Sequence, residues 1–215
     1  NQIRFGEAGT CDALVEVLRK SVETGLLESS VGYVCMAIYK LCYDNKRNRK
    51  KFGEIGGCEL LSRVLQCDPI LPFVCKNACL AISKLCTDLP QNQTVFHDHG
   101  CCVSIVSALA KQLTNATSCE HICRAIAYLC RENISNRQVI GAAGGCEEVI
   151  KALRYHNLKS LVAQNGCHAL SELCCDVPEN RSRISSEDSC ELVVSVLVLH
   201  RSLPPTVERS CIAIG

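Results

Sequence analysis

A period of 44 residues is the feature that most constrains how this chain can fold. An asparagine recurs in register with separations of 47, 44, 44 and 44 residues, at Asn1, Asn48, Asn92, Asn136 and Asn180. A fixed period of this length is typical of stacked supersecondary units that bury their apolar faces against their neighbours. The sequence therefore predicts a single array with units at 1–47, 48–91, 92–135, 136–179 and 180–215, the last one incomplete. We expect the chain to be a piece of a longer protein.

The cysteines follow the same period. Of the 19 cysteines, 14 fall in three columns. These columns are Cys11, Cys58, Cys102, Cys146 and Cys190; Cys35, Cys79, Cys123, Cys167 and Cys211; and Cys42, Cys86, Cys130 and Cys174. In a reducing compartment cysteine serves as a small, buried apolar residue. Equivalent helices of stacked units lie about 8 to 10 Å apart, beyond the ~7 Å that a disulfide tolerates between Cα atoms. We therefore expect packing thiols and no disulfide.

Hydrophobic spacing within a unit predicts three helices. In the fourth unit these are a short helix at 136–143, which Gly144 ends by adopting a left-handed conformation, and longer helices at 146–156 and 161–175. The three extra residues of the first unit fall between Ser21 and Ser30, where we expect a loop to absorb them. No alternation long enough to indicate a strand is present.

The repeated motif resembles the armadillo repeat. Each copy has Asn-Arg or a variant of it, a glycine turn and a leucine-rich helix, and then a run such as ACLAISKLC, from Ala78 to Cys86, where the family usually has Ala-Leu-x-Asn-Leu-Ala. The resemblance covers the whole chain. It implies an all-α, right-handed α-solenoid superhelix of three-helix repeats. It also implies a non-catalytic protein–protein interaction scaffold, which would bind a partner protein or an extended peptide on the concave face lined by the third helices.

The family's peptide-binding members carry a tryptophan and an asparagine, four residues apart, on that face. At the tryptophan position this sequence has Met36, Leu80, Arg124, His168 and, in the last unit, Ile212. At the asparagine position it has Lys40, Lys84, Tyr128 and Glu172, and Lys76 adds another cation. The sequence departs from the family at every one of these positions, so the resemblance does not imply a nuclear-import receptor. The candidate partner-binding residues are Met36, Lys40, Lys76, Leu80, Lys84, Arg124, Tyr128, His168 and Glu172.

Two other functions stay open. The chain could be the regulatory arm of a multidomain enzyme or a small-GTPase regulator. It could also bind nucleic acid or another anionic ligand through Lys40, Lys76, Lys84 and Arg124. A balance of 23 basic and 22 acidic residues and an aromatic content of 4% argue against nucleic acid. We find no catalytic or phosphate-binding motif, and we expect neither enzymatic activity nor a cofactor.

One cluster raises the question of a metal. His97, His99, Cys101 and Cys102 lie close together in sequence, but zinc ligands usually occur as spaced pairs, which this cluster lacks. Packing and surface roles are therefore favoured, and metal binding is left open.

Three further features bear on location. The basic run at 46–51 could be a localisation signal or an anion patch, although such runs are more often solvated faces. Glycosylation sequons occur at Asn92, Asn115, Asn133 and Asn180, and we expect them to be unoccupied because the thiol content indicates a reducing cytoplasmic, or also nuclear, location. No apolar run reaches the roughly 18 residues of a membrane span, so no membrane partner is expected.

Overall fold

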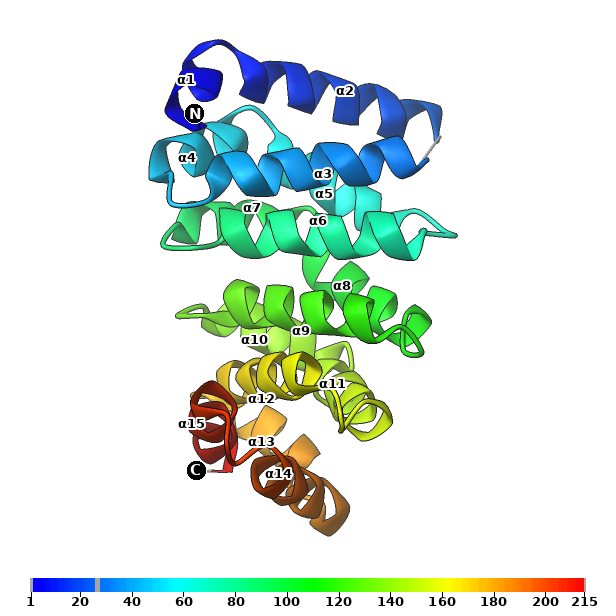
Figure 1. The fold of residues 1–215 in the computed structure, drawn as a ribbon, viewed down its shortest axis with the longest axis vertical. Coiled ribbons are helices and arrows are strands. Elements are labelled where there is room, and N and C mark those ends of the chain that lie inside the picture. Colours follow the sequence, from blue (N-terminus) through cyan, green and yellow to red (C-terminus); the bar gives the residue numbers. More distant parts are fainter. Residues whose placement is uncertain (1, 26–27, 215) are drawn as a thin grey trace.

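The structure is a computed structural model that describes residues 2–25 and 28–214, and within them every regular element is a helix (Figure 1). The helices follow one another in groups of three. The short first helices are α1 (Gln2–Glu7), α4 (Lys46–Glu54), α7 (Pro90–Asp98), α10 (Ile134–Ala142) and α13 (Pro178–Ile184). The second helices are α2 (Thr10–Thr24), α5 (Gly57–Gln66), α8 (Cys101–Lys111), α11 (Gly145–Tyr155) and α14 (Glu187–Leu199). The third helices are α3 (Ser29–Cys42), α6 (Pro72–Leu85), α9 (Ala116–Cys130), α12 (Ser160–Cys174) and α15 (Pro204–Ile214).

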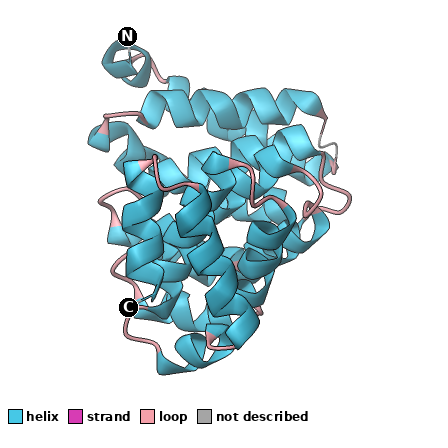
Figure 2. Ribbon diagram, turned by 60° about the horizontal axis from the view of Figure 1, so that its bottom comes forward, coloured by secondary structure: helices cyan, strands magenta, loops and turns pink. Residues whose placement is uncertain are grey.

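The groups stack in chain order along one direction. Each third helix packs against the third helix of the next group, so α3, α6, α9, α12 and α15 form one surface of the stack, with the first and second helices behind it (Figure 1). We call this surface the third-helix face. The turned view in Figure 2 shows the described helices joined by short loops. None of the described helices is both long enough and apolar enough to cross a membrane.

The cysteine columns lie in the core of the first four groups. Cys35, Cys58 and Cys123 are completely buried, and all 19 cysteines are free thiols. Burial raises the pKa of Cys35 to about 12, so this thiol stays protonated. The expected packing role is thus confirmed for these groups. It is wrong for the last group, where Cys190 and Cys211 are exposed because no further group covers that end of the described stack.

One buried asparagine per group ties each group to the one before it. The side-chain Nδ2 donates to the carbonyl seven residues earlier, in the last turn of the preceding third helix, at 2.8 Å in Asn48, Asn92, Asn136 and Asn180. In three groups it also donates to a carbonyl of the preceding short helix, at 2.9 to 3.2 Å, the acceptors being Gln2, Arg49 and Arg137. Because a buried amide has to be paired, these bonds fix how the groups stack. The asparagines lie two residues inside their short helices, so the structural groups begin two residues before the register marks in the sequence.

Glycine makes room for this asparagine. A Cβ at Gly53 would collide with Oδ1 of Asn92, and a Cβ at Gly141 would collide with Oδ1 of Asn180. The equivalent residue of the third group is His97, whose ring Nδ1 lies 2.8 Å from Oδ1 of Asn136. Among the described hydrogen bonds, Asn136 makes none to a backbone carbonyl of the preceding short helix. The side chain of His97 therefore takes over a link that a backbone carbonyl makes in the other groups.

The turns between helices repeat as closely as the helices do. Gly56 and Gly144 have φ angles of 90° and 88°, in the left-handed region, which confirms the predicted glycine turn. A second set of left-handed residues follows each of the first four third helices, at Asp44, Asp88, Glu132 and Asp176, with φ between 50° and 54°. Sequence analysis did not identify these positions as turns. Aspartate tolerates the left-handed region better than most residues do, which suits it to this turn.

The extra residues of the first group lengthen a helix. Helix α2 has 15 residues, whereas α5 has 10 and α11 has 11, and it ends at Gly25 in a left-handed cap. The prediction that a loop between Ser21 and Ser30 absorbs the insertion is therefore wrong over the described part, because the chain stays helical through Thr24. Residues 26 and 27 of that segment lie outside the described residues.

Candidate functional site

The nine candidate residues all lie on third helices. Helix α3 carries Met36 and Lys40, α6 carries Lys76, Leu80 and Lys84, α9 carries Arg124 and Tyr128, and α12 carries His168 and Glu172. Lys40 is exposed, His168 is buried at 9% exposure, and the other seven are partly buried.

Three cations of the third-helix face rest on aromatic rings. Lys76 Nζ lies 5.2 Å from the ring centroid of Phe73, and Lys84 Nζ lies 4.5 Å from that of Tyr43. The guanidinium carbon of Arg124 lies 5.9 Å from the ring of Tyr128. A ring face attracts a cation and restricts its position without neutralising its charge. The ring contacts therefore hold positive charge in place on this face.

The cations of the face also lack carboxylate partners. Among the described ion pairs none involves Lys40, Lys76, Lys84 or Arg124. Burial, and after it the positive charge of Arg124, lower the pKa of Lys84. The face between α6 and α9 thus carries Lys76, Lys84 and Arg124 without an ion-pair partner in the described structure.

The basic run at 46–51 differs from these residues. Lys51 pairs with Asp12, Arg47 lies 3.3 Å from Glu7, and Lys50 lies 3.6 Å from Glu54. Arg49 is buried and donates to the carbonyl of Cys42 at 3.2 Å. Most of the run is thus engaged within the fold, which favours the structural reading of this run over an anion patch.

A polar recess opens where α9, α12 and α15 meet. Its volume is about 250 Å³. The side chains that line it include Glu120, Arg124, Tyr128, Gln164, Asn165, His168 and Arg209. Tyr128 and His168 pack edge to face with ring centroids 6.0 Å apart. The recess therefore brings together three of the candidate residues, from two neighbouring groups.

Glu120, which lines the recess, and its neighbour His121 are both titratable. Burial is the main cause that lowers the pKa of His121 to about 4, and the positive charges of Arg124 and Lys76 lower it further, so the imidazole is neutral near pH 7. Its Nδ1 is buried without a hydrogen-bond partner in the described structure and lies 3.5 Å from Glu120. Burial raises the pKa of Glu120, while Arg124 and Lys76 oppose this rise. These shifts show that Lys76 and Arg124 act on the same region of the face.

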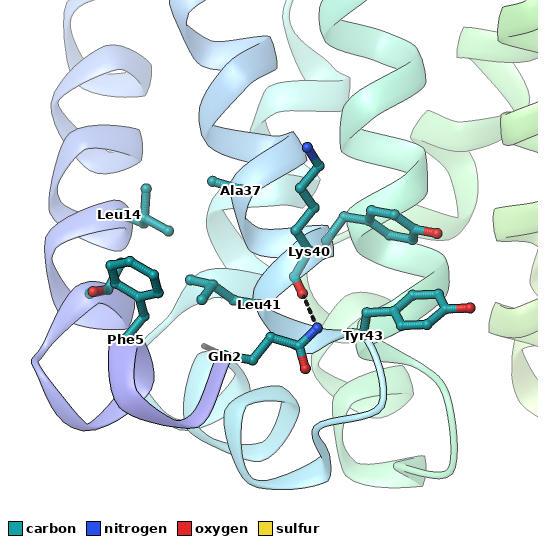
Figure 3. Close-up of a pocket in the computed structure, with 9 residues that line it drawn as sticks. Gln2, Phe5, Leu14, Ala37, Lys40, Leu41 and Tyr43 are labelled. Atoms are coloured by element: carbon teal, nitrogen blue, oxygen red, sulfur yellow. Dashed lines mark hydrogen bonds between the residues drawn. The ribbon is translucent and has the colours of Figure 1, made fainter.

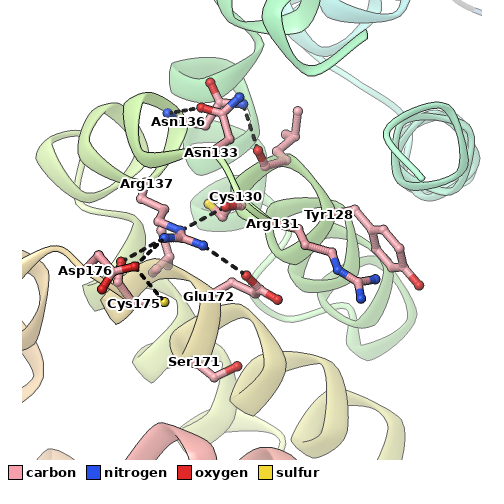
Figure 4. Close-up of polar contacts among 12 residues, drawn as sticks. Tyr128, Cys130, Arg131, Asn133, Asn136, Arg137, Ser171, Glu172, Cys175 and Asp176 are labelled. Atoms are coloured by element: carbon pink, nitrogen blue, oxygen red, sulfur yellow. Dashed lines mark hydrogen bonds and ion pairs between the residues drawn. The ribbon is translucent and has the colours of Figure 1, made fainter. Parts of the chain in front are cut away.

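Glu172 does not offer a free carboxylate to the face. It lies 3.6 Å from Arg137, whose side chain is 7% exposed (Figure 4). It also lies 3.5 Å from His168. Although burial opposes ionisation, the contact with His168 and the charge of Arg137 lower the pKa of Glu172. Arg137 also donates to the carbonyls of Cys130 at 2.9 Å and Cys175 at 3.1 Å. Glu172 is therefore part of the packing of α12 on α10 within the fourth group as well as part of the face.

The metal candidate is dispersed in the fold. His97 bonds Asn136, His99 is exposed, and Cys101 and Cys102 are buried in the core. Within the described residues no group of three or more histidine, cysteine or acidic side chains is placed to hold a metal ion.

A second hollow, of about 620 Å³, lies at the α1 end of the stack (Figure 3). Phe5, Leu14 and Leu41 give it largely apolar walls. Gln2 Nε2 donates to the carbonyl of Lys40 at 3.0 Å, and the ammonium of Lys40 extends in the opposite direction (Figure 3). Lys40 thus lies at the boundary between this hollow and the third-helix face.

Several residues of the recess were not among those predicted from the sequence. Glu120, Gln164, Asn165 and Arg209 lie three or four residues before the residues at the tryptophan position, Arg124, His168 and Ile212. The signal that identifies them is helical spacing, since residues three and four apart share a helix face. Arg137 was also not predicted as a site residue, because its position in the repeat does not show whether the arginine side chain is buried or exposed.

Comparison with known proteins yields the fold alone. No protein-family model matches this chain, and no curated protein matches it. Three crystal structures of engineered proteins are similar in structure. One has 20% sequence identity and a TM-score of 0.82, covering 99% of this chain and 49% of that one. Two others have 19% and 18% identity and TM-scores of 0.76 and 0.77, covering 91% and 95% of this chain and 77% and 84% of theirs.

The fold therefore defines a class. Helices packed on helices, the 44-residue period and the likeness to these structures describe an all-α repeat protein of stacked helices. The chain spans about half of the similar structure with the highest TM-score quoted above.

Proposed function

We propose that the chain is an armadillo-type, right-handed superhelical array that acts as a non-catalytic scaffold and binds a segment of a partner protein along its third-helix face. The three-helix groups, their period and the exposure of the third helices on one side support the assignment. An extended segment advances about 3.3 Å per residue, so one group, about 8 to 10 Å along the stack, accommodates roughly three residues of the partner.

The observation that carries the proposal is the contrast between two sets of cations. Those of the basic run on α4 are mostly paired with carboxylates of the chain itself, whereas Lys76, Lys84 and Arg124 rest on rings and have no carboxylate within ion-pair distance. Positive charge that is ordered but not neutralised is suited to steer and orient an acidic partner.

The test is a comparison of two charge-reversal variants in reducing lysate. The first carries Lys40→Glu, Lys84→Glu and Arg124→Glu on the third-helix face. The second carries Arg4→Glu, Lys46→Glu and Arg154→Glu, which make the same change in net charge at exposed positions on first and second helices. We expect the first variant to lose the proteins that wild type captures and the second to retain them. Identical captured proteins in both variants would contradict the proposal.

The same cations could also bind a nucleic acid, which is the second candidate function. The dependence of binding on salt concentration distinguishes a nucleic-acid ligand from a protein partner. For a nucleic-acid ligand, log Kd rises linearly with the logarithm of the salt concentration, with a slope of about 0.9 for each phosphate that is neutralised on a duplex. The acidic side chain of Glu120 in the recess favours the protein partner. A slope of several units with a duplex probe, lost in the first variant, would favour nucleic acid instead.

A further inference from the structure

The polar recess between α9, α12 and α15 has a charge balance that identifies its ligand. Two guanidinium groups, Arg124 and Arg209, and one carboxylate, Glu120, line it. Neither arginine has an ion pair in the described structure, and the carboxylate of Glu120 lies 3.5 Å from His121. With His121 neutral near pH 7, these groups leave one positive charge without a counterion.

The hydrogen-bonding groups of the recess also favour an acceptor. A guanidinium only donates, and its planar fork matches the two oxygens of a carboxylate. Gln164 and Asn165 add side-chain amides to the lining, although Asn165 Nδ2 already donates to the carbonyl of Leu161 at 2.9 Å. A volume of about 250 Å³ accommodates a side chain and not a folded element.

We propose that this recess is a subsite for a single aspartate or glutamate side chain of the partner segment. The inference rests on the proposed function, since the segment would run along the third-helix face. That face continues from the recess onto α6, so a segment that passes over the recess inserts a side chain and need not end there. A monoanionic carboxylate neutralises the single unpaired charge, whereas a phosphate dianion exceeds it.

The test uses small probes and no partner protein. The main probe is N-acetyl-aspartate N′-methylamide, which carries only a side-chain carboxylate, and its matched control is the asparagine analogue. N-acetylalanine presents a terminal carboxylate, and inorganic phosphate presents a dianion. The readout is the arginine Nε–Hε signals and the backbone amides of α9 and α15 in two-dimensional NMR of the full chain.

We expect saturable shifts of the Arg124 and Arg209 signals with the aspartate probe, and binding of the asparagine analogue at least about tenfold weaker. Arg124→Gln and Arg209→Gln should each weaken the aspartate probe about tenfold. Arg154→Gln, an exposed arginine on α11, should leave binding unchanged. Thermal unfolding of each variant shows whether the fold is kept. If Arg124→Gln does not fold, the prediction is tested with Arg209→Gln only.

Several results would overturn the subsite. These are the absence of saturation, equal binding of the aspartate and asparagine probes, or an equal effect of Arg154→Gln. Tighter binding of N-acetylalanine or of phosphate would overturn the assignment to an acidic side chain. If the aspartate probe does not bind but the charge-reversal variant loses its captured proteins, only the subsite is refuted. If the probe binds but the charge-reversal variant captures the same proteins as wild type, only the proposed function is refuted.

Discussion

Gly53 has no side chain because the amide of Asn92, in the next group, occupies the space where a Cβ would be. The Nδ2 of Asn92 donates from this position to the carbonyls of Arg49, at 3.0 Å, and Leu85, at 2.8 Å. The absence of one side chain thus permits two hydrogen bonds between groups.

Substituting Gly53 should therefore destabilise the fold although it lies in a helix. Gly→Ala at an unconstrained helix position usually stabilises by about 0.5 to 1 kcal/mol. For Gly53→Ala we expect a loss of about 1 to 3 kcal/mol in the free energy of unfolding, because Asn92 must move and leave buried carbonyls unpaired. Urea unfolding measures the difference. In the double variant Gly53→Ala, Asn92→Ala the two losses should be less than additive, and full additivity would contradict the contact.

His97 should hold its proton on Nδ1. Nδ1 lies 2.8 Å from Oδ1 of Asn136, and the Nδ2 of that amide already donates to the carbonyl of Leu129. An amide oxygen only accepts, so the ring nitrogen has to donate. Long-range ¹⁵N–¹H NMR of the neutral imidazole distinguishes the two tautomers. An Nε2–H tautomer would show that the Asn136 amide is turned over and that this link between groups is not formed.

His121 should make the fold sensitive to mild acid. The native pKa is about 4 and the ordinary value is 6.5, so between these values the unfolded chain binds a proton that the folded chain does not. Stability should therefore fall by about 2 to 3 kcal/mol as the pH falls from 6.5 to 4. Arg124 and Lys76 strengthen the effect, and Glu120, at 3.5 Å, opposes it.

The control is His121→Asn, because the equivalent residues of two other groups, Asn77 and Asn165, are asparagine. The loss of stability over this pH range should be smaller in the variant than in the wild type, as followed by chemical unfolding at each pH. Parallel curves for the two proteins would show that other groups cause the acid sensitivity.

Thiol reactivity should separate the cysteines by position. Cys175, Cys190 and Cys211 are exposed, and most of the others are buried. We expect Cys190 and Cys211 to react first with an aromatic disulfide reagent. Cys175 should follow, because the neighbouring Asp176 raises the pKa of that thiol. Mass spectrometry after short exposure of the native protein identifies the modified residues. Early modification of Cys58 or Cys123 would contradict the packing, while guanidinium should expose all 19.

The helices of each group could be predicted from the sequence because the spacing of apolar residues within a helix depends only on that stretch of chain. The residue types at Gly56 and Gly144 indicate a turn without knowledge of the neighbours, and the structure has it. The extension of α2 could not be predicted in the same way, since Ser21 to Thr24 has the composition of a loop and becomes helical in its packed context.

The location of the candidate site could be predicted from the sequence, but the contacts that its side chains make could not. Helical register places Arg124 and Tyr128 on the third-helix face, and the structure has them there. Register cannot show that Glu172 turns toward Arg137, because that contact joins residues 35 apart, on the first and third helices of one group. Nor could it show that Arg209, from the last group, reaches the same recess as Arg124.

The asparagine links have a consequence for how the array comes apart. Each one joins a group only to the group before it, so the array resembles a linear polymer with joints between adjacent segments. Within the described stack, the asparagine at the joint between α7 and α10 pairs with the side chain of His97, where the asparagines of the other joints pair with a backbone carbonyl of the preceding short helix. Substitution of this one imidazole therefore acts at a single joint, in the middle of the row, while the joints on either side keep their own bonds.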